Sequence, residues 1–151
     1  MKKILEKFVK ENRLKKEKGI GFDQIKRRIE RAKIDLNNAK LLLKSDQIGA
    51  FRMAYDSMLQ AGISLLLSYG YRPEIKGFHK IVVDFSKEAL GKNYAILTRQ
   101  FDQMRRNRND AIYDTIIISS KEAKESIETA KDLLDKIIKH IKNNNPQKEL
   151  F

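Results

Sequence analysis

Residues 23–43, which read DQIKRRIERAKIDLNNAKLLL, decide how this chain folds. Hydrophobic side chains recur in this stretch at every third or fourth position, while basic residues fill the positions between them. The hydrophobic positions are Ile25, Ile29, Ala32, Leu36, Ala39 and Leu43. This spacing places all of them on one face of an α-helix. With Asp23 as its N-cap, the stretch predicts an amphipathic helix that packs on a core.

The rest of the chain repeats this pattern in segments of similar length. Further helices are predicted over residues 46–69, 77–90, 94–112 and 119–142, and short loops join them. Seven glycines and two prolines in 151 residues are too few for many short strands joined by tight turns. We therefore expect an all-α fold, an antiparallel up-and-down bundle of four or five helices.

An additional basic helix precedes this bundle. Residues 2–18 carry a short apolar stripe among many lysines, which predicts an accessory helix followed by a glycine hinge. The predicted organisation is a basic N-terminal helix over residues 1–21, a helical bundle over residues 22–142 and a disordered tail over residues 143–151. Gly62 falls on the inner stripe of the bundle's second helix, so another helix is expected to approach it closely. Gly62 and inward-facing arginines are unfavourable in a lone bundle, so they also predict a dimer.

The net charge of +12 is concentrated near the N-terminus. The first 45 residues contain 15 basic and 6 acidic side chains and so carry +9 of that charge. A basic arm of this kind suits a polyanion, and RNA is the first candidate. Deleting residues 1–21 is then expected to weaken RNA binding more than it alters the fold. The alternative is that lysines only keep a helical protein soluble.

Composition excludes several classes of function. The absence of cysteine removes disulfides, thiolate nucleophiles and cysteine-ligated zinc sites. The two histidines, His79 and His140, are too far apart for a helical metal-binding pair, so we expect no metal and no cofactor. Charged residues interrupt the apolar start of the chain, and no apolar stretch is long enough to span a bilayer. These features predict a cytoplasmic protein without membrane contact.

Residues 104–114, which read MRRNRNDAIYD, are the most unusual segment. They continue a hydrophobic helical stripe, and Arg108 falls on its inner face. A guanidinium group there needs partners. In a structural interpretation, Asp56 or Asp110 neutralises it inside the bundle. In a functional interpretation, arginines in a cleft bind phosphate and asparagines add hydrogen bonds.

Several stretches together carry a family resemblance. Residues 32–42 follow the pattern A-x-x-x-L-x-x-A-x-L-L, residues 50–55 read AFRMAY, and residues 70–73 read GYRP ahead of His79 and the arginine segment. Over residues 22–142 the chain resembles small prokaryotic members of the HEPN domain family. The resemblance implies a helical bundle that forms a homodimer, often paired with a minimal nucleotidyltransferase in a toxin–antitoxin or defence system. Many members are metal-independent RNases.

The resemblance also implies a motif, in which an arginine and a polar residue are followed by a histidine after four to six intervening residues. Two copies of the motif face each other across the dimer. Positions 110–115, where that histidine is expected, read DAIYDT and contain none. Aligning Arg106 with the motif places Tyr113 where some members carry a tyrosine that the nucleotidyltransferase modifies, whereas aligning Arg108 places Tyr113 at the histidine position. A tyrosine with a pKa near 10 is a poor general base.

We therefore predict a cleft at a dimer interface that binds RNA or nucleotide phosphate, with the catalytic histidine missing. The predicted binding residues are Arg105, Arg106, Arg108, Asn109, Asp110 and Tyr113, of which Arg108 and Tyr113 are the catalytic candidates. The alternatives are a divergent metal-independent endoribonuclease and a structural helical module that only binds another protein.

Three local predictions follow from the residues around this cleft. The arginine helix is expected to end between Asn109 and Asp114, which lets Tyr113 fold back toward the arginines. His79 is predicted to be a packing residue, since it lies in the first turn of its helix beside an aromatic side chain. His140 is predicted to complement the dipole at the end of the last helix.

Overall fold

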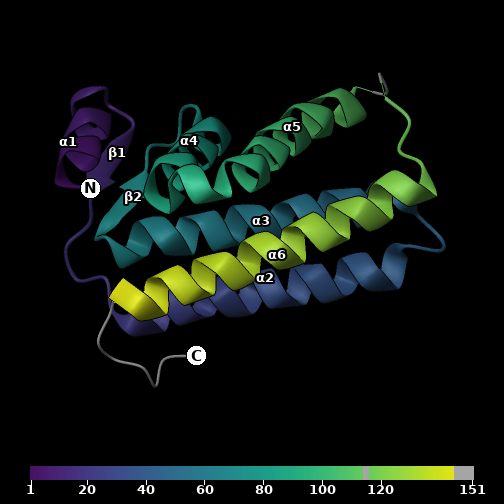
Figure 1. Cartoon of the computed structure of the whole chain (residues 1–151), viewed down its shortest axis with the longest axis horizontal. Coiled ribbons are helices and arrows are strands. Elements are labelled where there is room, and N and C mark those ends of the chain that lie inside the picture. Colours follow the sequence, from purple (N-terminus) through teal and green to yellow (C-terminus); the bar gives the residue numbers. More distant parts are fainter. Residues whose placement is uncertain (114–115, 145–151) are drawn as a thin grey trace.

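The protein is a bundle of long helices arranged around a central one, in a computed structural model that describes residues 1–113 and 116–144. The helices are α1 (Lys2–Lys10), α2 (Phe22–Leu42), α3 (Gln47–Ser68), α4 (Phe78–Leu90), α5 (Ala95–Ile112) and α6 (Ser120–Asn144), with a short 3₁₀ turn, η1 (Lys92–Tyr94), before α5. Helix α3 contacts α2, α4, α5 and α6 (Figure 1). This arrangement confirms the predicted all-α bundle.

The N-terminal segment differs from its prediction. Helix α1 ends at Lys10, and strand β1 (Leu14–Lys16) pairs antiparallel with strand β2 (Tyr71–Pro73). Between them Asn12 adopts a left-handed conformation with φ of 59°, which asparagine tolerates better than most residues. One helix over residues 2–18 was therefore wrong, because pairing with a distant strand redirects the second half of the segment.

This N-terminal segment packs on the same core as the bundle. Leu5, Phe8 and Leu14 are buried there, and the Phe8 ring meets Phe85 of α4 edge to face at 5.9 Å. Arg13 forms an ion pair with Asp84 of α4. Deleting residues 1–21 would expose this apolar surface. The expectation that such a deletion mainly weakens binding is therefore not supported by the packing.

The helix ends agree with the sequence at one junction and differ at another. Asp46 is the N-cap of α3, and its side chain accepts a hydrogen bond of 2.9 Å from the backbone N–H of Gly49, as predicted. Helix α2, however, has Gly21 as its N-cap, and the Gln24 side chain accepts from the Gly21 N–H at 3.0 Å. Asp23 was the wrong cap, since the helix begins two residues earlier, where the side-chain oxygen of Gln24 accepts from the backbone N–H of Gly21.

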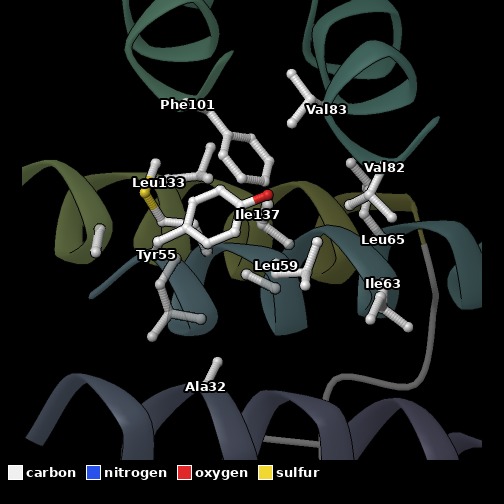
Figure 2. Packing of buried hydrophobic residues seen from close by; sticks show 14 of the residues in the cluster. Ala32, Tyr55, Leu59, Ile63, Leu65, Val82, Val83, Phe101, Leu133 and Ile137 are labelled. Atoms are coloured by element: carbon white, nitrogen blue, oxygen red, sulfur yellow. The ribbon is translucent and has the colours of Figure 1, made fainter. Parts of the chain in front are cut away.

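The core lies where α3 meets the helices on both sides of it. Figure 2 shows Tyr55 of α3 beneath Phe101 of α5, with Leu133 and Ile137 of α6 beside them and Ala32 of α2 below. All five side chains are at most 1% exposed. The buried tyrosine therefore lies close to α5, the helix that carries the arginines.

Gly62 lies where α3 packs closely against α4. A Cβ atom at this position would overlap Cγ1 of Val82 and crowd the Ser86 hydroxyl. The predicted close approach is confirmed, and it occurs within one chain. Gly62 therefore does not require a second copy of the protein.

The last helix continues slightly beyond its predicted end. Asn143 and Asn144 are the final residues of α6, whereas residues 145–151 of the predicted tail lie outside the described residues. At the other end of α6, Ser119 caps the helix by accepting a hydrogen bond of 3.1 Å from the backbone of Glu122. Across the described parts of the chain, no helix is both long enough and apolar enough to cross a bilayer.

Candidate functional site

The end of α5 carries half of the predicted binding residues. The helix ends at Ile112 and Tyr113 is its C-cap, which confirms an end between Asn109 and Asp114. Tyr113 is 78% exposed, so it does not fold back onto the arginines as predicted. Asn109 and Asp110 are also exposed, while Asp114 and its neighbour Thr115 lie outside the described residues. These three side chains surround the helix end rather than line a closed cleft.

Asp102 organises the first two arginines. Nε of Arg105 donates to Oδ1 of Asp102 at 3.0 Å, and Nη2 of Arg106 donates to Oδ2 at 2.7 Å. Partial burial acts to raise the pKa of Asp102, but the hydrogen bonds and charges of both arginines outweigh it and lower that pKa. Asp102 therefore stays ionised and holds both guanidinium groups. Sequence reasoning missed it, although its spacing of three and four residues from the arginines was the available signal.

Arg108 is placed differently from its two neighbours. Its guanidinium carbon lies 5.7 Å from the centre of the Tyr55 ring, within the range of a cation–π contact. Its Nε is buried and has no hydrogen-bond partner among the described residues. A buried donor without an acceptor is unfavourable, so this N–H group is suited to donate a hydrogen bond to an anionic ligand.

The carboxyl group of Asp56 feels the charge of Arg108 but does not bind its guanidinium group directly. Burial raises the pKa of its carboxyl group, while the nearby charge of Arg108 acts in the opposite direction. Within the described residues, no ion pair of 4.0 Å or less joins the two side chains. Direct neutralisation of Arg108 by Asp56, one of the two partners in the structural interpretation, is therefore not observed.

His79 lies next to the same tyrosine. The Tyr55 hydroxyl and Nδ1 of His79 are hydrogen-bonded at 2.8 Å, and the two rings stack at 5.7 Å. Burial lowers the pKa of His79, and the positive charges of Arg108 and Arg105 lower it further. His79 packs on its neighbours, as predicted. It also places a neutral imidazole close enough to Arg108 and Arg105 for their positive charges to lower its pKa. Sequence spacing could not reveal this, because His79 comes from α4 and the arginines from α5.

The family comparison covers every part of this arrangement. The family model of the HEPN domain matches residues 25–141. The chain belongs to the HEPN domain family. A comparison with curated proteins finds no match. The HEPN match includes the arginines of α5, Tyr55 and His79, whereas α1 and β1 lie outside it.

The second histidine of this HEPN domain has a different role from the predicted one. Nε2 of His140 is hydrogen-bonded to the Tyr69 hydroxyl at 2.7 Å, and burial lowers the pKa of the imidazole. A neutral histidine does not complement a helix dipole, so that prediction was wrong. The described residues of the domain contain no group of three His, Asp or Glu side chains placed to hold a metal ion.

Proposed function

We propose that this HEPN protein binds RNA or nucleotide phosphate through the arginines of α5. Arg108 carries the proposal, because its buried Nε lacks an acceptor in the described structure and its guanidinium lies over the Tyr55 ring. Phosphate oxygens accept paired hydrogen bonds from arginine, and such bonds between charged groups are among the strongest in proteins. A bound phosphate would supply the acceptor that the described residues do not supply.

The charge of the whole chain supports a polyanionic ligand. The net charge is +12, and Asp102 balances only part of the charge of Arg105 and Arg106. Long-range attraction then draws RNA toward the protein, and each phosphate contact releases counterions from the RNA. The affinity should therefore fall steeply as the salt concentration rises.

The direct test compares Arg108→Ala with Arg99→Ala. Both changes remove one positive charge from α5, but Arg99 is exposed and lies more than two turns away along the helix. With a single-stranded RNA oligonucleotide at low salt, R108A is expected to lose about tenfold or more in affinity, equal to about 1.4 kcal/mol. R99A should change it by about twofold or less. Intact RNA binding by R108A together with a large drop in melting temperature would assign Arg108 to core stability instead.

A second candidate, a metal-independent endoribonuclease, is favoured by His79. A neutral imidazole beside two arginines could remove the proton from a 2′-hydroxyl, whose oxygen then attacks the adjacent phosphorus. The bond from phosphorus to the 5′-oxygen breaks, which leaves a 2′,3′-cyclic phosphate, and the 5′-oxygen takes up a proton from water. The arginines would stabilise the negative charge that develops on the phosphate. In this assignment His79 of α4 takes the role of the motif histidine, which is absent from positions 110–115.

Cleavage of single-stranded RNA in the presence of EDTA tests this second candidate. Loss of a general base costs about 10²- to 10⁴-fold in rate, so His79→Gln should abolish measurable cleavage. His140→Gln is the matched control, because His140 also pairs with a tyrosine, the C-cap residue of α3, but has no arginine acting on its pKa. Absence of cleavage by the unmodified protein would leave binding alone as the function.

The partners in the proposal come from the family resemblance. We include a homodimer, a minimal nucleotidyltransferase partner, a toxin–antitoxin or defence role and a cytoplasmic location. Tyr113 fits such a partner, since its 78% exposure at the end of α5 leaves the hydroxyl open to modification. Gly62 gives the dimer no support, because Val82 of the same chain explains it. Sedimentation at micromolar concentration tests the dimer. If the mass is that of one chain at every concentration, the dimer is ruled out.

A further inference from the structure

Residues 1–21 lie outside the HEPN match, yet they contact α4, the helix that carries His79. Helix α1 and strand β1 lie beside β2 and α4 at one end of the bundle (Figure 1). Phe8 and Leu14 of this segment are buried in the core. Positive charge alone does not require buried contacts, because lysines attract a polyanion from exposed positions. The packing therefore indicates a second role for the segment.

The backbone around β1 holds the connection between α3 and α4 at two points. The N–H of Glu17 donates to the carbonyl of Gly70 at 2.9 Å, and the N–H of Glu74 donates to the carbonyl of Arg13, also at 2.9 Å. The paired strands β1 and β2 lie between these two bonds. His79 follows Glu74 by only five residues, so the position of β2 constrains where α4 begins.

The side chain of Arg13 connects the N-terminal segment directly to α4. Its guanidinium group pairs with Asp84, and its guanidinium carbon lies 4.6 Å from the centre of the Phe8 ring. Asp84 also pairs with Lys80 at 3.1 Å, and Lys80 is the residue that follows His79. The side chains of Arg13 and Asp84 are 25% and 28% exposed, and partly buried pairs are screened less by salt than exposed ones. The pair therefore fixes the first half of α4 against the N-terminal segment.

The first turn of α4 has little support of its own. The buried face of the helix begins at Ile81, whereas Phe78 and His79 before it are only partly buried. The N–H groups of a first helical turn lack partners within the helix, and the N-cap, Gly77, has no side chain to accept from them. Unsupported helix ends fray. The hydrogen bond between His79 and Tyr55 therefore depends on what holds the start of α4.

We propose that residues 1–21 hold the start of α4 in place, with Arg13 as a positioning residue for His79. The segment keeps the imidazole against Tyr55 and close to Arg108. The consequence for RNA cleavage rests on the endoribonuclease candidate above, whereas the positioning itself depends on no activity.

The other tyrosine–histidine pair supplies an internal reference. Its tyrosine, Tyr69, meets the Phe85 ring edge to face at 5.8 Å, and Phe85 in turn contacts Phe8. These contacts are ring packing in the core and do not include the ion pair with α4. Loss of that ion pair should therefore affect His79 and leave His140 as it is, whereas a general loss of packing should affect both.

NMR titration of the two imidazoles in the full chain tests the proposal by comparing Arg13→Ala with Lys15→Ala. Both changes remove one positive charge from the N-terminal segment, but Lys15 is exposed whereas Arg13 is paired with Asp84. R13A should raise the pKa of His79 toward its ordinary value, because a loosened first turn moves the imidazole into water and away from the α5 arginines. K15A should leave that pKa unchanged, and His140 should titrate as before in both variants.

The variant Asp84→Ala separates positioning from charge. It breaks the same ion pair but removes a negative charge, which by itself would lower the pKa of a nearby histidine. If the pair positions His79, D84A should raise that pKa, as R13A does. Opposite shifts in the two variants, no shift in either, or an equal shift at His140 would overturn the proposal.

Failure of this proposal can be told apart from failure of the proposed function. Absence of RNA cleavage by the unmodified protein would remove the role of His79 as a base and leave the titration result unchanged. Where the unmodified protein cleaves single-stranded RNA, R13A should lower kcat about threefold or more with little change in KM, because the arginines of α5 stay in place. A change in KM alone would contradict a positioning role.

Discussion

Helix α3 and its C-cap residue present two tyrosines to two histidines, at Tyr55–His79 and at Tyr69–His140. The hydrogen bonds are alike, at 2.8 and 2.7 Å, and burial lowers the pKa of both histidines. At His79 the positive charges of Arg108 and Arg105 lower the pKa further, whereas burial is the cause at His140. The hydrogen bond is therefore a general feature of packing on α3, whereas the positive charge is particular to one pair.

This difference separates structural from functional properties within one molecule. Any property that follows from burying a tyrosine–histidine pair should be shared by both pairs. A property that requires the arginines should appear at His79 alone. The Tyr69–His140 pair is thus an internal control for the candidate site.

The largest expected difference in stability separates Tyr55→Phe from Tyr69→Phe. Tyr55 is fully buried, so removal of its hydroxyl leaves Nδ1 of His79 without its partner at a cost of about 1–3 kcal/mol. Tyr69 is only half-buried, so water can replace the lost bond and the cost should be about 1 kcal/mol or less. Urea denaturation of both variants measures this, and equal losses would show that the two pairs are energetically equivalent.

The next effect is a loss of stability in mild acid. Both histidines have a pKa below the ordinary value when folded, so the unfolded chain binds more protons as the pH falls below about 6.5. Their contribution to the free energy of unfolding is complete above that pH and is lost as the pH falls toward the folded pKa values. Denaturation between pH 7.5 and 5.5 should show this.

Variants divide that pH dependence between the two pairs. H79Q should flatten the curve more than H140Q, because the arginines add to the effect of burial only at His79. Comparison with the unmodified protein cancels the contribution of carboxylates such as Asp56, whose raised pKa has the opposite sign. An unchanged slope in H79Q would contradict the prediction.

The smallest effect is a shift in titration caused by Arg108→Ala. Removal of this charge should raise the pKa of His79 toward its ordinary value, because the charged imidazole is then repelled less. His140 should titrate as before, since burial is the cause of its lowered pKa. NMR titration of the two imidazoles measures both shifts at once. A shift of equal size at His140 would indicate a general change of structure.

Much of the fold could be predicted because helical periodicity is local. The stripe from Ile25 to Leu43, the cap at Asp46 and the end of α5 before Asp114 each depend on residues within a few positions of one another. The second half of the segment over residues 2–18 could not be predicted in this way. Its strand forms by pairing with Tyr71–Pro73, and nothing nearby in the sequence encodes that partner.

The sequence by itself determined the helices, the excess of positive charge, the arginines of α5 and the absence of a histidine at positions 110–115. Only the tertiary structure decided that Tyr55 brings His79 beside Arg108, and that Val82 rather than a second chain fills the space at Gly62. The reason is physical. Spacing along a helix defines which face a residue occupies, but which faces meet depends on how whole helices pack around α3.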